Sequence, residues 1–169
     1  MAPAGAHPYN GAMHPSITSP RHPQRERIAF MGEVVTVRLD AAASSGTLSL
    51  LEHAMPRGLA TPLHVHPHED EALLVLAGEL TVPVCGAEQA AAAGDAVWLP
   101  RGVPHAFRVD ADGATVLAIT TPGGHETFFR AAGDPGGGVP AGPPDPERME
   151  RAAALAGIEI LGPPPFEPS

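Results

Sequence analysis

The sequence lacks lysine altogether and contains one cysteine, Cys85, among its 169 residues. One cysteine cannot form an internal disulfide, and this composition is typical of a reducing compartment. The net charge of −9 argues against nucleic-acid binding, because phosphate recognition needs clustered basic residues. No apolar run approaches the length of a membrane span, and the first thirty residues contain no hydrophobic signal core. We therefore expect a soluble cytoplasmic protein that binds neither nucleic acid nor membranes.

Composition divides the chain into three predicted parts. Residues 1–27 are rich in proline, glycine, alanine and histidine without a hydrophobic period, which indicates a flexible arm. Residues 28–122 have the texture of a β-barrel, and their length suffices for one core. Residues 123–169 form a C-terminal extension with short helices and a linker rich in proline and glycine.

The middle part consists of short segments that alternate or are rich in β-branched residues, with turn signals between them. Such spacing is typical of an all-β barrel or sandwich. The segment 71–76 is apolar on both faces, which suggests a strand buried between two layers. Trp98 has the opposite parity from its neighbours Val97 and Leu99, so we assign it to the outer surface. The predicted strands cover residues 33–39, 47–55, 63–66, 71–76, 79–85, 87–93, 96–100, the end of 100–109, and 114–120.

The C-terminal part carries two helix signals. Residues 123–133 predict a short helix, with Phe128 and Phe129 packed against the barrel. A second helix begins after Asp145 as N-cap and ends at Gly157, a favourable residue for a left-handed C-terminal turn.

Residues 58–78, GLATPLHVHPHEDEALLVLAG, contain the densest cluster of candidate metal ligands. His64 and His66 are two residues apart, so an extended strand projects both rings from one face. Glu71 follows on the next strand, and nitrogen and oxygen ligands together suit a divalent cation. Residues 94–109, GDAVWLPRGVPHAFRV, add His105 from a different strand. We predict a site of three histidines and one carboxylate, with open positions for water or substrate.

These two segments resemble the paired motifs of the cupin superfamily. The fixed positions of the two motifs are matched by Gly58, His64, His66, Glu71 and Gly78, and by Gly94, Pro100, Gly102 and His105. The resemblance implies an all-β cupin fold, a double-stranded β-helix or jelly-roll barrel, with a short C-terminal helical extension. It also implies His64, His66, Glu71 and His105 as ligands of one divalent transition metal, namely Fe, Mn, Ni, Co or Zn.

A narrower likeness covers more of the chain. The segments 104–107, 121–129 and 157–163 are similar to those of single-domain quercetin 2,3-dioxygenase-like cupins. That likeness implies a metal-dependent dioxygenase that uses dioxygen and acts on a hydroxylated or enolic aromatic small molecule. Leu73 and Leu74 stand where such enzymes often have aromatics, and His125 stands where an apolar residue is usual. These departures argue against a flavonol as the substrate.

Several roles around the predicted metal stay open. Glu71 is a candidate catalytic residue as well as a ligand, because a carboxylate beside a bound hydroxyl can act as general base. The cluster would also suit a non-redox cyclase or isomerase with zinc as Lewis acid, or a small-molecule-binding cupin without catalysis. A homodimer that covers an exposed strand edge is a further possibility. Alternation gives these candidates for the substrate pocket: Leu50, Leu63, Leu73, Val75, Val82, Val97, Leu99 and Phe107.

The remaining polar residues near the motifs have simpler predicted roles. We expect His53 to be a structural histidine with its hydrogen bonds satisfied. Glu69 and Asp70 are predicted to be solvated turn residues, and His68 an exposed turn residue. His125 could overhang the site, but the sequence alone favours a position outside it.

Overall fold

The structure is a computed structural model that describes residues 26–84, 87–110, 112–138 and 145–166. The predicted N-terminal arm therefore lies almost wholly outside the described residues, as do Cys85 and residues 139–144 of the predicted linker. Neither helix of the described part has the length and apolar character that crossing a membrane requires.

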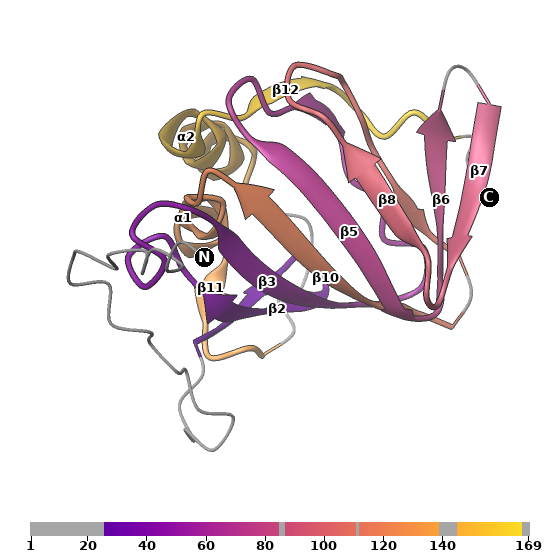
Figure 1. The fold of residues 1–169 in the computed structure, drawn as a ribbon, viewed down its shortest axis with the longest axis horizontal. Helices are drawn as coiled ribbons and strands as arrows, with labels where there is room; N and C mark the ends of the chain where they lie inside the picture. Colours follow the sequence, from indigo (N-terminus) through magenta and orange to yellow (C-terminus); the bar gives the residue numbers. More distant parts are fainter. Residues whose placement is uncertain (1–25, 85–86, 111, 139–144, 167–169) are drawn as a thin grey trace, which may run out of the picture.

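Seven antiparallel strands form the larger sheet, in the order β11-β1-β2-β3-β10-β5-β8 (Figure 1). Each runs close to its predicted segment where one was predicted, while β1 and β11 are additional. The strands are β1 Arg27–Phe30, β2 Glu33–Leu39, β3 Ser49–Met55, β5 Asp70–Ala77, β8 Ala96–Leu99, β10 Ala114–Thr121 and β11 Asp134–Pro135.

The facing layer is built from two groups of strands. One is the pair β12 (Glu159–Gly162) and β4 (Leu63–Val65), and the other is β7 (Ala87–Ala92), β6 (Glu79–Val84) and β9 (Arg108–Val109). Backbone hydrogen bonds join them, since the amides of His64 and His105 each donate to the other's carbonyl, at 3.0 and 2.8 Å. The two layers enclose an apolar core to which both contribute, including Leu51, Leu73, Val75, Leu80, Val82 and Val109.

Alternation along β5 corrects one prediction from the sequence. Glu71, Leu73 and Val75 are buried, whereas Leu76 on the opposite face is 47% exposed and Leu74 is only partly covered. The prediction of a strand buried on both faces is therefore wrong. The large sheet turns one face to the core, and leucines on the other face meet solvent.

Both predicted helices are present, and they close one end of the barrel (Figure 1). In α1 (Glu126–Ala132), Phe128 and Phe129 are buried and meet Phe30 edge to face, with ring centroids 5.3 and 5.6 Å apart. These contacts confirm the predicted packing of the aromatic pair against the barrel.

The second helix, α2 (Pro146–Ala156), has the predicted ends. The Asp145 carboxylate accepts a hydrogen bond from the Glu147 amide at 3.1 Å, which satisfies one free N–H of the first turn. Gly157 ends the helix in the left-handed conformation, with φ 70°. The chain then enters β12 beside β4, so the C-terminal segment supports the strand that carries His64. The division at residues 28 and 123 stays a prediction.

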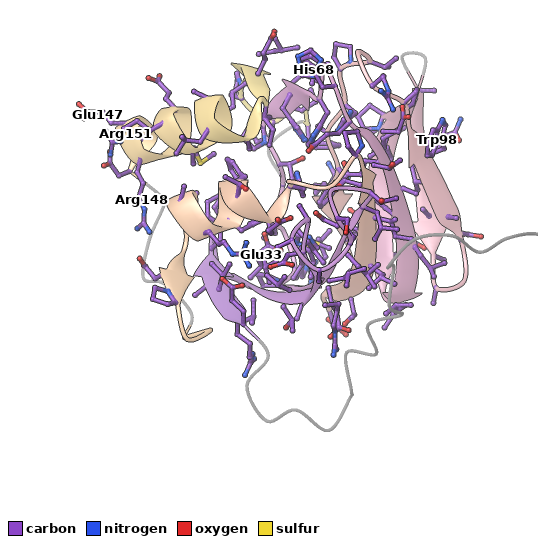
Figure 2. The ribbon with its side chains drawn as sticks, turned by 60° about the vertical axis from the view of Figure 1, so that its left-hand side comes forward. Glu33, His68, Trp98, Glu147, Arg148 and Arg151 are labelled. Atoms are coloured by element: carbon purple, nitrogen blue, oxygen red, sulfur yellow. The ribbon has the colours of Figure 1, made fainter. Side chains whose placement is uncertain are left out.

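Trp98 lies on β8, which is an edge strand of the described sheet. Its side chain points away from the barrel (Figure 2) and is 60% exposed, which confirms the outward assignment.

Candidate metal centre

The four predicted ligands meet between the two layers. His64 lies on β4, His66 follows directly after that strand, and Glu71 is the second residue of β5. His105 comes from the loop after β8 and is bridged to His64 through the backbone. The ring of His64 lies 5.2 Å from that of His66 and 4.4 Å from that of His105, measured between centroids. The structure thus brings together side chains that are up to 41 positions apart (64 to 105) in the sequence.

Backbone carbonyls fix the orientation of two of these rings. Nδ1 of His64 donates to the Pro62 carbonyl at 2.8 Å, and Nδ1 of His105 donates to the Val103 carbonyl at 2.9 Å. Because a carbonyl only accepts, the hydrogen must lie on Nδ1, and Nε2 of each neutral ring keeps its lone pair. Metal-binding histidines in proteins are usually held in this way.

The inward-facing atoms suit a metal ion. Oε2 of Glu71 lies 3.5 Å from Nε2 of His105 and 3.9 Å from Nε2 of His66. One potential ligand atom from each of the four residues lies within 4.8 Å of the others. Ligands at about 2.0–2.2 Å from one ion would lie roughly 3–4.4 Å apart. Nε2 of His66 and of His105 are buried without a hydrogen-bond partner among the described residues, so the residues present fit such a group.

The electrostatics keep the site in its ligating form. Burial, with a smaller contribution from the neighbouring His105, lowers the pKa of His64 to about 4. The ring is therefore neutral at pH 7, as metal binding requires. Burial also favours the protonated form of Glu71, but the adjacent His105, His125 and His66 rings outweigh it and hold the pKa of Glu71 below its ordinary value.

The turn between β4 and β5 is tied to the loop that carries His105. The Asp70 carboxylate accepts hydrogen bonds from the Arg101 amide at 2.9 Å and from its guanidinium at 2.5 Å. The Gly102 amide donates to the His66 carbonyl at 2.9 Å. Asp70 is thus not merely a solvated turn residue, because it fixes where the His105 loop begins.

Glu69 and His125 lie behind His66, contrary to the sequence predictions. Glu69 is 8% exposed rather than solvated, and its Oε2 lies 3.2 Å from Nδ1 of His66. His125 is buried at the start of α1, with its ring centroid 5.0 Å from that of His66. Burial lowers the pKa of His125 to about 3, although the Glu71 carboxylate opposes this shift. His68, by contrast, is exposed as predicted.

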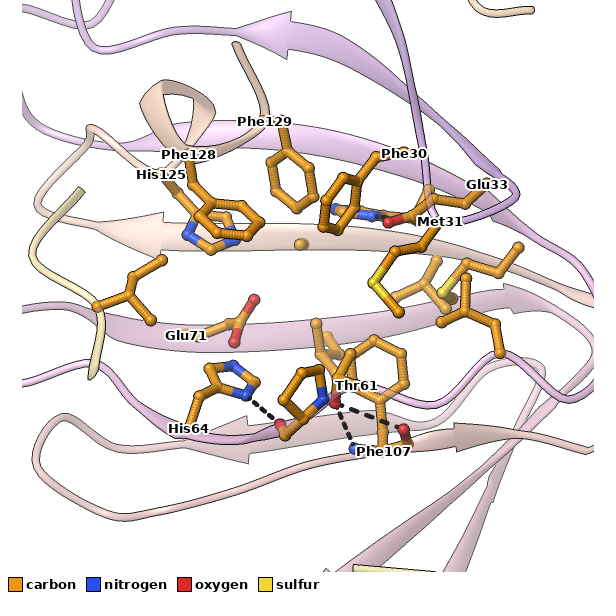
Figure 3. Close-up of a pocket in the computed structure, with 18 of the residues that line it drawn as sticks. Phe30, Met31, Glu33, Thr61, His64, Glu71, Phe107, His125, Phe128 and Phe129 are labelled. Atoms are coloured by element: carbon orange, nitrogen blue, oxygen red, sulfur yellow. Dashed lines mark hydrogen bonds and ion pairs between the residues drawn. The ribbon is translucent and has the colours of Figure 1, made fainter. Parts of the chain in front are cut away.

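A narrow, mainly apolar cavity adjoins the four-residue cluster (Figure 3). Its volume is about 80 Å³, and His64, Glu71 and His125 lie in its wall. Of the eight pocket candidates predicted from alternation, Leu73 and Phe107 line it. Alternation misplaced the rest, because Leu50 faces away on β3 while the other five do not reach the cavity wall. The candidates that do not line the cavity are Leu50, Val75, Val97 and Leu99, together with Leu63 and Val82.

His53 also lines this cavity, and it is not the satisfied structural histidine that we predicted. Its Nδ1 lies 2.9 Å from Oε2 of Glu33, but its Nε2 is buried without a hydrogen-bond partner in the described part of the chain. Alternation along the strand could have indicated this contact. Glu33 lies two positions before Val35 and therefore on the same inward face of β2, and Val35 pairs with His53 on β3.

Comparison with known proteins agrees with this architecture. The family model described as "Cupin domain" matches residues 50–121, the stretch that contains all four candidate ligands. The quercetin 2,3-dioxygenase of Bacillus subtilis (strain 168) is 28% identical over 146 residues, which make up 83% of this chain and 43% of that protein. This chain therefore spans less than half the length of that relative.

Solved structures show the same fold. That of KdgF from Halomonas sp. superposes with a TM-score of 0.53 at 19% identity, covering 60% of this chain and 89% of the other. Oxalate decarboxylase from Bacillus subtilis gives a TM-score of 0.52 at 21% identity, covering 59% of this chain and 27% of the other. At this identity the likeness concerns the fold alone, and it confirms the predicted double-stranded β-helix barrel.

Proposed function

The chain belongs to the cupin superfamily, and on that premise we propose that it is a metal-dependent dioxygenase for a small hydroxylated or enolic aromatic compound. His64, His66, Glu71 and His105 are the proposed ligands of one divalent transition ion. One observation carries the proposal: Nε2 atoms of buried histidines and a buried carboxylate converge at the wall of a mainly apolar cavity. The similarity to the Bacillus quercetin 2,3-dioxygenase supports the choice of reaction class.

When bound, an ion such as Fe, Mn, Ni or Co would supply Lewis acidity and a site for redox chemistry with dioxygen. The side chains do the rest. Glu71 lies at the cavity wall, where its carboxylate, once released from the ion, can accept the proton of a substrate hydroxyl. The apolar wall, to which Leu73 and Phe107 contribute, excludes water and so favours the polar contacts that the substrate makes inside.

The size of the cavity narrows the substrate class. Its volume of about 80 Å³ is well below the roughly 300–1,000 Å³ of typical ligand pockets. A cavity of about 150 Å³ in another protein is known to hold one benzene molecule, so the space here suits nothing larger than a single ring. We therefore propose a substrate built on one ring, in agreement with the departures at Leu73, Leu74 and His125 from the quercetinase pattern.

Elemental analysis followed by oxygen uptake tests this proposal. Purified protein is loaded in parallel with Fe, Mn, Co, Ni and Zn, and dioxygen consumption is recorded with catechols, enediols and flavonols. We expect consumption with at least one redox-active metal and a one-ring substrate, and none with Glu71→Gln. A zinc-only protein that converts substrate without dioxygen would instead favour the non-redox isomerase or cyclase, for which the same donor set is suitable.

Two further features belong to the proposal. Pairing of two copies along the exposed β8 edge would cover Trp98 and give a homodimer. A cytoplasmic location stays a prediction from the composition.

A further inference from the structure

We propose that the Glu33–His53 pair is a second ligand-binding element of the cavity, which binds a hydroxyl group of the ligand away from the metal centre. This inference rests on the proposed function, since it requires the cavity to hold a small hydroxylated molecule. Neither residue belongs to the cupin motifs matched in the sequence.

The geometry leaves one atom of the pair unused. His53 on β3 is 7% exposed and Glu33 on β2 is 5% exposed, so both are buried. Nδ1 of His53 lies 2.9 Å from Oε2 of Glu33, and an ionised carboxylate only accepts hydrogen bonds, so Nδ1 is the donor. Nε2 then has no hydrogen-bond partner among the residues that the structure describes, and His53 lines the cavity.

A structural role does not account for this arrangement. Buried polar atoms in folded proteins almost always have partners, because an unpaired one keeps the full penalty of lost hydration. Around the pair the wall is apolar, with Phe30, Met55 and Phe129 among the lining residues. An apolar pair would pack there without leaving any polar atom unsatisfied. The missing partner of Nε2 is therefore best supplied by a ligand.

The chemistry of the pair selects the ligand group. Burial opposes a charge on His53, but the Glu33 carboxylate outweighs it and raises the pKa of His53 above its ordinary value. A protonated Nε2 donates, whereas a neutral one accepts. A hydroxyl group satisfies both states, because its oxygen accepts and its hydrogen donates.

The position of the pair sets the shape of the ligand. In Figure 3, Glu33 lies near Phe30 and Met31 at one side of the cavity, while His64 and Glu71 lie at another. A ligand that reaches both must carry oxygen atoms at two separated positions on an apolar ring. The ligand class is therefore a ring with a hydroxyl or enol head toward the metal and a further hydroxyl group toward His53.

Two probes that differ by one hydroxyl test this assignment. Catechol and 1,2,4-trihydroxybenzene share the same head, and only the second carries a further hydroxyl. Their affinities for zinc-loaded protein are measured by calorimetry under argon, which prevents turnover. Wild-type protein should bind 1,2,4-trihydroxybenzene about threefold to tenfold more tightly, the contribution of one hydrogen bond to a buried group.

The matched variant removes both polar partners at once. Glu33→Leu/His53→Phe leaves no unpaired carboxylate in the core, so we expect this double variant to fold. His68→Gln, on the exposed turn, is the control. The double variant should retain its zinc and its affinity for catechol but lose the preference for 1,2,4-trihydroxybenzene. The control should keep that preference. An unchanged preference in the double variant would overturn the assignment.

A second measurement needs no variant. In ¹⁵N-histidine NMR spectra of the zinc-loaded wild type, the Nε2 resonance of His53 should shift with 1,2,4-trihydroxybenzene and stay in place with catechol. Equal binding of the two probes, with no such shift, overturns the second binding element while the metal-centred site stands. Binding of neither probe overturns both, together with the proposed substrate class.

Discussion

Oε2 of Glu71 on β5 lies 3.5 Å from Nε2 of His105 in the loop after β8, although 34 positions (71 to 105) separate the two residues in the sequence. When the His105 ring is neutral and donates through Nδ1 to the Val103 carbonyl, as the 2.9 Å contact indicates, its Nε2 turns a lone pair toward the carboxylate. Two acceptors face each other in a buried place. A cation between them resolves this conflict, which is why we regard the pair as half of a metal site.

Replacing Glu71 by glutamine tests that view. The variant keeps the shape of the side chain but loses its charge. We expect the affinity for a divalent ion to fall by more than about 100-fold, which exceeds the loss caused by removing a residue that only hydrogen-bonds to a ligand. Competition with a chromophoric chelator measures this change. His68→Gln should bind the ion as wild type does. Equal affinity in Glu71→Gln and wild type would remove Glu71 from the ligand set.

Glu69 gives a graded version of the same experiment. Its carboxylate accepts from Nδ1 of His66 at 3.2 Å and so orients that ring without reaching the centre of the cluster. Glu69→Gln should lower metal affinity by about 10–100-fold, less than Glu71→Gln does. The ordering of the two variants in one titration is the decisive readout. A larger effect at Glu69 would mean that it, and not Glu71, is a ligand.

The Glu33–His53 pair predicts a pH dependence of stability in the metal-free protein. The folded-state pKa of His53 is raised above its unfolded value near 6.5, so the pair stabilises the folded state fully below that pH. The stabilisation is lost as the pH rises through the folded-state pKa. Urea unfolding with a chelator present should show that Glu33→Gln is most destabilised near pH 6 and less so near pH 9. A difference that is constant or grows with pH would contradict a charged pair.

Two motif glycines differ in how tightly the backbone surrounds them. Both have positive φ, 80° at Gly78 and 78° at Gly58. A Cβ added at Gly78 would lie 2.1 Å from the Gly113 carbonyl oxygen, whereas a Cβ added at Gly58 would have open space within 4 Å. Gly58→Ala should cost about 1–2 kcal/mol of unfolding free energy from the backbone conformation alone. Gly78→Ala adds a clash with backbone and should cost clearly more. Urea unfolding of both variants compares them, and equal losses would show that the β5–β6 connection is not as tight as the structure has it.

The exposed Trp98 predicts the association state. If two copies pair along β8, light scattering after gel filtration should give a dimer for the wild type and a monomer for Trp98→Asp. In a dimer of this variant, one carboxylate from each copy would be buried at the β8 edge, and their like charges would repel. A monomeric wild-type protein would contradict this arrangement.

The sequence was sufficient to group the four candidate ligands but insufficient to place the residues around them. Two histidines at i and i+2 on a strand must share a face, so His64 and His66 could be paired without coordinates. Most strand bounds were predictable for a similar reason, because glycine and proline mark the turns. The positions of Glu69 and His125, however, depend on how the β4–β5 turn and the start of α1 fold over His66.

The pocket was the least predictable feature. Alternation identifies the inward face of a strand, but it does not say which inward residues meet a cavity and which meet the opposite sheet. Val75 and Leu73 share a face of β5, yet only Leu73 lines the cavity. His53 was misjudged because its partner Glu33 lies on a separate strand, and only the register of β2 against β3 brings the two side chains together.

The most direct measurement is the metal content of the purified protein after loading and dialysis, compared with that of His105→Ala. We predict one divalent transition ion per chain in the wild type and essentially none in the variant, with the circular dichroism of both proteins alike. A wild-type chain that retains no ion, or a variant that retains as much as wild type, would contradict the metal centre on which the proposed dioxygenase depends.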